Sequence, residues 1–157
     1  FKNLSINLTD TIQQSFSLLF TGSPLETTGD MVSFVKNNYI NKKEIFEKIF
    51  LNQQTLVENL KSALEQNNLN EIKKIIGKGE KNLEKIGVVS LSSEKIIRDI
   101  EKNGGSAKIC GAGGVTKSSG IILAIHEDQH LIQAIAKKNN IIYSQVALGQ
   151  EGVRIEK

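Results

Sequence analysis

The sequence has a single cysteine, Cys110, a single proline and no tryptophan. One cysteine excludes a disulfide bond within the chain, and it agrees with a protein that is kept in the reducing cytoplasm. Aromatic residues make up only 5% of the chain, and they do not alternate with basic residues as they do in many proteins that bind single-stranded nucleic acid. The net charge of +3 is also too small to favour a nucleic-acid partner.

Long hydrophobic runs are missing as well. No apolar stretch approaches the roughly 20 residues that a membrane-spanning helix needs, and the first residues carry no signal-peptide pattern, so we expect no membrane partner. The 157 residues, of which 39% are hydrophobic, suffice for one domain with its own core. Because the chain begins with Phe1 and not with methionine, we expect it to be a piece of a longer protein.

Strand-like and helix-like segments occupy almost the whole chain. The apolar periodicity predicts strands at 15–20, 106–109, 121–125 and 141–147, with a further short β segment at 150–157. It predicts helices at 28–38, 42–66, 69–86, 93–102 and 127–140. Thr27 or Thr28 suits the start of the first helix, and Ser92 or Ser93 suits the start of the fourth.

This order of segments predicts one α+β domain over residues 1–157. We expect a ferredoxin-like split β-α-β layer, in which helices pack on one face of an antiparallel sheet and extra helices form an insertion. On the first helix, the apolar face would consist of Met31, Val32, Phe34 and Val35. Gly77 and Gly79 lie inside the third helix and predict a close packing contact or a local irregularity there.

A glycine-rich loop between two strand-like runs carries most of the functional information. Gly111, Gly113 and Gly114 flank Ala112, and the absence of side chains lets backbone N–H groups face outward. Successive N–H groups of this kind form a concavity that binds phosphate. Lys117 could add positive charge to it. Hydroxyl donors could come from Thr116, Ser118 and Ser119.

An ordinary hairpin turn explains the same loop, and the residues alone leave both interpretations open. The loop has neither the P-loop spacing nor a helix after it, which excludes the two common nucleotide-binding turns. A substitution of Gly113 by alanine separates the interpretations. A phosphate-binding loop would lose turnover and little stability, because a surface loop glycine affects folding less, whereas a plain turn would lose stability and keep its activity.

Other reactive residues favour structural roles. His126 and His130 formally match the H-E-x-x-H zinc pattern, but His126 ends a strand, so the pair need not share a helix face; we expect no metal site. Cys110 is expected to be a small buried residue at a strand end. Glu26 and Asp30 look like isolated acids near a turn. A solvated helix face is the expected role of Lys73, Lys74, Lys78, Lys81 and Lys85.

Three segments, at 20–32, 82–90 and 105–114, resemble the C-terminal domain of the GHMP small-molecule kinases, mevalonate kinase in particular. They are the F-T-G-S-P-L-E-T-T-G-D-M-V run, the N-L-E-K-I-G-V-V-S run and the G-S-A-K-I-C-G-A-G-G run, which is similar to the third motif of that family. The chain departs from the motif at Cys110, where the family has a hydroxyl residue, and after Gly114.

The resemblance implies phosphoryl transfer from ATP, with Mg²⁺, to a small alcohol or phosphate acceptor. It implies that Thr27, with Thr28 as the alternative, helps to hold the acceptor, and that residues 111–114 with Lys117 close over the phosphates. The ATP-binding motif and the catalytic lysine and aspartate of the family belong to an N-terminal domain that this sequence lacks. We therefore expect no catalytic residue in this chain, no tightly bound cofactor and no activity of the chain alone.

Three functions remain open at this point. The first is the C-terminal domain of a mevalonate kinase-like enzyme, and the second is a phosphomevalonate or sugar-phosphate kinase of the same family. The third, from another class, is a free-standing ferredoxin-like module that binds a small ligand. A homodimer is compatible with each of them.

Overall fold

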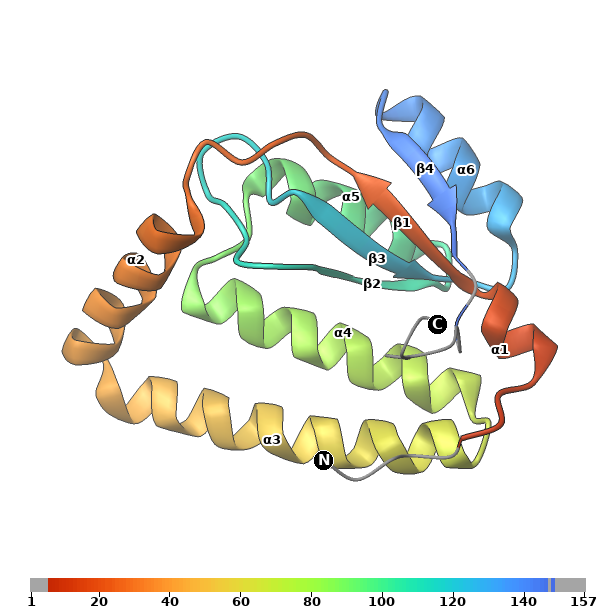
Figure 1. Ribbon diagram of the computed structural model, residues 1–157, viewed down its shortest axis with the longest axis horizontal. Coiled ribbons are helices and arrows are strands. Elements are labelled where there is room, and N and C mark those ends of the chain that lie inside the picture. The colour runs from red at the N-terminus through yellow and green to blue at the C-terminus, as the bar shows by residue number, and fades with distance from the viewer. Residues whose placement is uncertain (1–5, 147, 149–157) are drawn as a thin grey trace, which may run out of the picture.

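The computed structural model describes residues 6–146 and 148 of the chain (Figure 1). Its helices are α1 (Asp10–Gln14), α2 (Thr28–Asn41), α3 (Lys43–Glu65), α4 (Leu69–Ile86), α5 (Leu91–Lys102) and α6 (Gln129–Lys138). Its strands are β1 (Phe16–Phe20), β2 (Ser106–Ile109), β3 (Ile121–Ile125) and β4 (Ile142–Gln145). None of the described helices is both long and apolar enough to cross a membrane.

The four strands form one sheet in the order β2-β3-β1-β4, and every neighbouring pair is antiparallel. In the central pair, Leu19 lies opposite Ile122. This is the strand order of a split β-α-β layer, because β1 and β3 occupy the centre and the strands that follow their crossover helices occupy the edges. The predicted α+β fold with an antiparallel sheet is confirmed.

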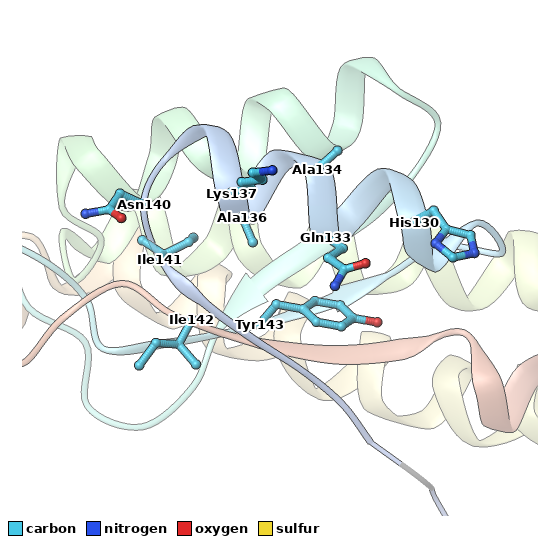
Figure 2. Close-up of a pocket in the computed structure, with 9 residues that line it drawn as sticks. All are labelled: His130, Gln133, Ala134, Ala136, Lys137, Asn140, Ile141, Ile142 and Tyr143. Atoms are coloured by element: carbon cyan, nitrogen blue, oxygen red, sulfur yellow. The ribbon is translucent and has the colours of Figure 1, made fainter.

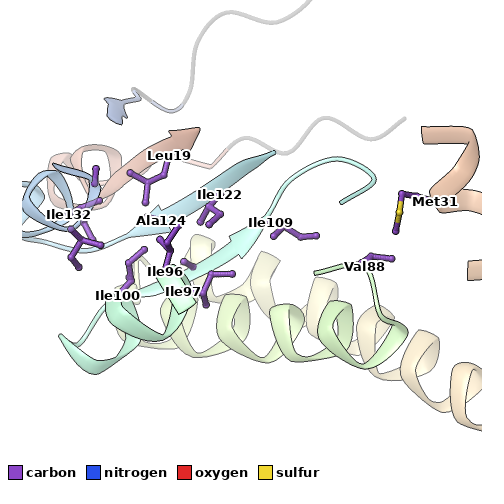
Figure 3. Packing of buried hydrophobic residues seen from close by; sticks show 13 residues of the cluster. Leu19, Met31, Val88, Ile96, Ile97, Ile100, Ile109, Ile122, Ala124 and Ile132 are labelled. Atoms are coloured by element: carbon purple, nitrogen blue, oxygen red, sulfur yellow. The ribbon is translucent and has the colours of Figure 1, made fainter. Parts of the chain in front are cut away.

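Helices α5 and α6 cover one face of this sheet (Figure 3). Ile97 from α5 and Ile132 from α6 are completely buried against strand residues such as Leu19 and Ile122. Alternate residues of each strand point to this face, which is the period that a half-buried strand requires. The main core therefore lies between the sheet and these two helices.

The predicted insertion consists of α2, α3 and α4. Helix α4 lies along β2, and α3 packs on the outer side of α4 (Figure 1). Helix α2 lies beyond the end of the sheet and buries only Met31 completely. The expectation that Val32 and Phe34 also face the core is wrong, because these side chains are 61% and 39% exposed.

Close packing, as predicted, explains Gly77 inside α4, whereas a side chain at Gly79 would make only ordinary van der Waals contact. A Cβ atom at Gly77 would lie 3.2 Å from Ser106 Oγ of β2, and one at Gly79 would lie 3.6 Å from Gln53 Nε2 of α3. The helix continues through both positions without a break. Its end at Gly87, with φ of +84°, is the left-handed cap that the sequence predicts.

Several predicted boundaries need correction. Helix α2 continues to Asn41, past the predicted end at 38, and the short helix α1 was not predicted. The N-cap of α5 is Ser90, because its hydroxyl accepts the Ser93 N–H bond; neither Ser92 nor Ser93 is the cap. Helix α6 is shorter than the predicted 127–140, since Asp128 caps it. The predicted β segment at 150–157 lies outside the described residues.

Candidate phosphate-binding site

The three segments that resemble kinase motifs meet at one end of the sheet. The glycine-rich loop at 110–120 joins β2 to β3, and Gly114 donates its N–H to the carbonyl oxygen of Val88 at 3.1 Å. The turn after β1 lies on the other side of the loop, where Thr116 donates its N–H to Glu26 at 2.8 Å. Residues about 25 and 90 positions apart in the sequence thus form one structural unit.

The first half of the loop has the geometry of an anion-binding backbone. Gly111 and Gly113 have φ of +76° and +79°, and they flank Ala112. Among the described residues, no hydrogen-bond acceptor pairs with the N–H of any of these three residues. Gly111 is exposed, and a Cβ atom there would meet nothing within 4 Å. Three consecutive N–H groups are thus unpaired; the one at Gly111 is on an exposed residue, and those at Ala112 and Gly113 are on a half-buried and a buried residue.

The other two glycines of the predicted loop are explained by packing. Gly113 and Gly114 are both buried. A Cβ atom would lie 2.1 Å from Val88 O at Gly113, and 2.4 Å from Ser118 O at Gly114. The expectation that Gly113 is a surface glycine is therefore wrong, because the backbone of the preceding segment occupies the space that a side chain would need.

The hydroxyl groups in the second half of the loop are not free donors. Ser118 donates to Gly22 O at 2.9 Å, and Thr116 Oγ1 donates to Glu26. Ser119 is buried and bonds Ser90 Oγ and Gly114 O. These hydroxyls hold the loop in place, so the predicted use of Thr116, Ser118 and Ser119 as phosphate donors does not fit the geometry.

Lys117 remains the cationic group of the loop. Its side chain is exposed, and its ammonium has no partner among the described residues. Its backbone is fixed, because its carbonyl oxygen accepts a hydrogen bond from Ser92 Oγ at 2.6 Å, in the first turn of α5. An exposed ammonium on a fixed backbone can add charge to an anion bound by the loop.

Thr27 and Thr28 lie at the N-terminus of α2, directly after the turn that contacts the loop. Thr27 is the N-cap: Oγ1 accepts from Asp30 N–H at 3.2 Å and donates to Asp30 Oδ2 at 2.7 Å. The hydroxyl bond to Oδ2, and a second bond to Oδ2 from the Thr27 N–H at 2.9 Å, lower the pKa of Asp30. Thr28 is exposed, and its hydroxyl has no partner in the described part of the chain. Thr28 is thus the freer of the two predicted acceptor-binding hydroxyls.

The histidines and the lysine face have structural surroundings. His126 Nδ1 accepts the Asp128 N–H bond at 2.8 Å, so Nε2 carries the proton and donates to Asn103 O at 3.0 Å. Within residues 6–146 and 148, no three His, Cys, Asp or Glu side chains are grouped so that they could hold a metal ion. Some α4 lysines form ion pairs with acidic side chains at the surface; Lys73 Nζ, for example, lies 3.0 Å from Glu127. Cys110 is half-buried at the end of β2.

Sequence reasoning missed Glu80. This side chain is completely buried, and Oε2 accepts the N–H bond of Ile109 at 2.9 Å, on the edge of β2 that pairs with none of the described strands. Burial raises its pKa to about 7, against the effects of the Ile109 hydrogen bond and of the nearby Lys108 and Arg98 charges. The signal was available, because Glu80 occurs four residues after Ile76 and three before Leu83, in the buried stripe of α4.

A separate hollow of about 760 Å³ lies between α6 and β4 (Figure 2). It shares no residue with the loop, and it contains His130 but not His126. Its polar groups come mainly from His130, Gln133, Lys137, Asn140 and Tyr143. None of the three motif-like segments contributes to it.

The comparisons with known proteins support the fold. No family model and no curated protein matches the sequence. The structure is similar to a Lin0012 protein from Listeria innocua (TM-score 0.76, 16% identity), covering 87% of this chain and 40% of that one. It is also similar to L. major mevalonate kinase in complex with R-mevalonate, with a TM-score of 0.70 and 20% identity, covering 83% of this chain and 42% of that one. A third similar structure is Streptococcus pneumoniae phosphomevalonate kinase in complex with phosphomevalonate and AMPPNP. Its TM-score is 0.68 at 19% identity, covering 83% of this chain and 39% of that one.

These likenesses confirm the fold that the resemblance to the GHMP kinases implies. The chain spans about 40% of the length of each of these proteins. At identities of 16 to 20%, the likeness concerns the fold and not the acceptor.

Proposed function

We propose that the chain is the C-terminal domain of an ATP-dependent small-molecule kinase of the GHMP type. The observation that supports this most directly is the row of free N–H groups at Gly111, Ala112 and Gly113. It lies in the same structural unit as the exposed Lys117, and next to the N-terminus of α2 with Thr27 and Thr28. A phosphate-binding backbone beside exposed hydroxyl groups is what transfer of a phosphoryl group to a small acceptor requires.

In this proposal the loop has an electrostatic role. The transferred phosphoryl group spreads negative charge over its oxygens, and fixed backbone donors stabilise that charge without reorganisation. Lys117 adds a positive charge that moves with a flexible side chain. The hydroxyl of Thr28 would hold a polar group of the acceptor. Thr27 could do so only if its hydroxyl gave up the bond to Asp30.

ATP and Mg²⁺ are the cofactors of the proposed parent enzyme. The loop residues fit a phosphate chain, but the described residues offer no cluster of acids for the metal. The nearest acids are engaged, since Glu26 bonds Thr116 and Asp30 bonds Thr27. Mg²⁺ would therefore be held by the nucleotide and by an N-terminal domain, which would also supply the catalytic lysine and aspartate.

Mevalonate is the acceptor that we propose, and phosphomevalonate is the second candidate. Phosphomevalonate is kept as a candidate because a mevalonate kinase and a phosphomevalonate kinase share this fold, and the fold does not separate the two acceptors. An acceptor screen on the protein with its N-terminal domain distinguishes them. The chain alone is expected to transfer no phosphate from ATP to either acceptor.

Titration of the ¹⁵N-labelled chain with inorganic pyrophosphate tests the phosphate-binding loop. We expect the amide signals of Gly111, Ala112 and Gly113 to shift with one common dissociation constant, and the signals of α3 to stay in place. Sulfate at equal ionic strength is the control for general charge effects. Shifts that are spread over surface lysines, or no shift at the three loop amides, would contradict the proposal.

A further inference from the structure

The turn after β1 and the second half of the glycine-rich loop contact each other along their whole length. Thr21 donates its N–H to Gly120 O at 2.9 Å, and Ser118 Oγ donates to Gly22 O at 2.9 Å. Pro24 lies against the loop glycines, since a Cβ atom at Gly114 would be 2.8 Å from Pro24 Cβ. These contacts hold the part of the turn that precedes Glu26.

Glu26 makes the last contact of this series, and it is the last residue before the N-cap of α2. Its Oε1 accepts both the N–H and the hydroxyl of Thr116. These bonds lower the pKa of Glu26, so the carboxylate stays ionised and remains an acceptor at neutral pH. Sequence reasoning treated Glu26 as an isolated acid because its partner is 90 residues away.

Helix α2 is attached to the rest of the domain by apolar side chains, and Met31 and Val35 pack against the main core. Met31 is its one completely buried side chain, and Figure 1 shows the helix lying beyond the end of the sheet. Phe34 contacts Gly87, where a Cβ atom would be 3.3 Å from its ring. At the far end of α2, Tyr39 stacks on Phe50 of α3. Glu26, directly before the N-cap, adds a hydrogen-bonded link between the start of α2 and the glycine-rich loop.

We propose that Glu26 is a positioning residue, which couples the N-terminus of α2 to the glycine-rich loop through its two bonds to Thr116. The inference rests on the proposed function, because it assigns the loop to the phosphates and Thr27 and Thr28 to the acceptor. Glu26 contacts neither ligand. It fixes the distance between the α2 N-terminus and Thr116, in the loop that also carries the unpaired N–H groups of residues 111–113.

Pyrophosphate binding distinguishes positioning from simple electrostatics, because the two predict opposite changes in the affinity of Glu26→Ala for pyrophosphate. Removal of a carboxylate near an anion site strengthens anion binding if charge alone matters. If Glu26 positions the loop, Glu26→Ala weakens pyrophosphate binding, by threefold or more. Glu26→Gln keeps an amide oxygen that accepts from Thr116 and removes the charge, so it binds as tightly as the unchanged chain or more tightly.

The experiment measures pyrophosphate affinity by calorimetry at fixed ionic strength for the full chain and for three variants: Glu26→Ala, Glu26→Gln and Thr116→Val. Glu44→Ala, which removes an exposed carboxylate from the first turn of α3, is the charge-matched control. Thr116→Val keeps the N–H bond and loses the hydroxyl bond, so we expect an intermediate effect. Thermal melts of each variant show whether the folded fraction is unchanged.

Amide hydrogen exchange of Thr116, whose N–H bonds Glu26, supplies a second measurement, which does not need a ligand. We expect faster exchange of this amide in Glu26→Ala than in Glu26→Gln. Equal exchange in the two variants, or tighter pyrophosphate binding by Glu26→Ala, would overturn the positioning role. If the unchanged chain binds no pyrophosphate, the proposed function fails, and the exchange data alone then decide whether Glu26 positions the loop.

Discussion

The α-carbon of Gly113 faces the carbonyl oxygen of Val88, and a Cβ atom at position 113 would lie 2.1 Å from that oxygen. Real Cβ atoms essentially never lie this close to a non-bonded backbone atom, so any side chain at 113 must displace the segment that leads into α5. Gly111, only two residues earlier, has the same sign of φ and open space around it. The two glycines thus serve different purposes in one loop.

Gly113→Ala is expected to destabilise the fold, and Gly111→Ala is expected to leave it largely intact. Alanine at a positive φ costs about 1–2 kcal/mol at either position. At Gly113 the clash with Val88 adds to this cost, because backbone atoms must move. Urea unfolding of both variants measures the difference, and an equal loss of stability would contradict the packing role of Gly113. The test of phosphate binding by substitution therefore belongs at Gly111.

Local patterns predicted the elements of this fold well, because helices and strands follow from the spacing of neighbouring apolar residues. The sheet, the helical insertion and the left-handed cap at Gly87 are examples. The pattern could not show which side of the loop is buried, since Val88 approaches Gly113 from 25 residues away. The bond between Glu26 and Thr116 was hidden for the same reason.

The apolar pattern of α2 led to a wrong prediction, because this helix does not lie against the sheet. Val32 and Phe34 are spaced as a buried face, but α2 lies beyond the sheet and leaves them exposed. Glu80 is the opposite case, a charged residue in a buried stripe. Its role as an acceptor for Ile109 N–H follows only from the strand order. Strand β2 is at the edge of the described sheet, so no described strand pairs with the N–H groups on its outer side. Tertiary contacts, which the local pattern does not show, determine the exposure of Val32 and Phe34 and the role of Glu80.

Substitution of Thr27 should change stability, and substitution of Thr28 should not. Thr27→Val removes the cap of α2 and costs about 1 kcal/mol, measurable by urea unfolding. The hydroxyl of Thr28 has no partner in the described residues, so Thr28→Val should be nearly neutral. The difference follows from the capping bonds, which Thr27 makes and Thr28 does not.

In the kinase with its N-terminal domain, the same two variants locate the acceptor. A lost hydrogen bond to a polar or charged acceptor group costs about 1.5–3 kcal/mol, which corresponds to a rise of at least tenfold in the acceptor KM. We expect this rise in one of the two variants, with the KM for ATP unchanged as the internal control. No change in acceptor KM in either variant would remove both residues from the acceptor site.

The stability of the chain should fall as the pH rises from about 4.5 to about 7, because of Glu80. Its pKa is about 7 in the folded state and 4.5 as the ordinary value. Between these values the unfolded chain releases a proton that the folded chain retains, so rising pH favours unfolding. The loss is at most about 3 kcal/mol and ends near pH 7. Urea unfolding at a series of pH values measures it.

Glu80→Gln should remove this slope, since the amide oxygen still accepts from Ile109 N–H and does not titrate. Asp30 and Asp99 have lowered pKa values and act in the opposite direction. Their contribution is lost as the pH falls below the ordinary range of carboxyl groups, so the two effects occupy different parts of the profile. Identical slopes for the unchanged chain and Glu80→Gln above pH 4.5 would show that Glu80 is not buried as described.

Lys117→Ala should weaken pyrophosphate binding, and more so at low salt than at high salt. The exposed ammonium acts on a bound anion across solvent, so its effect depends on screening. The Debye length is about 30 Å at 0.01 M ionic strength and about 3 Å at 1 M. Calorimetry at both ionic strengths measures the difference between Lys117→Ala and the unchanged chain. Lys48→Ala, at an exposed position of α3, is the control for net charge. If both lysine variants lose affinity equally, the effect belongs to the net charge of the chain and Lys117 has no place in the site. If Lys117→Ala alone loses affinity and the loss disappears at high salt, the ammonium faces the anion that the three loop N–H groups bind.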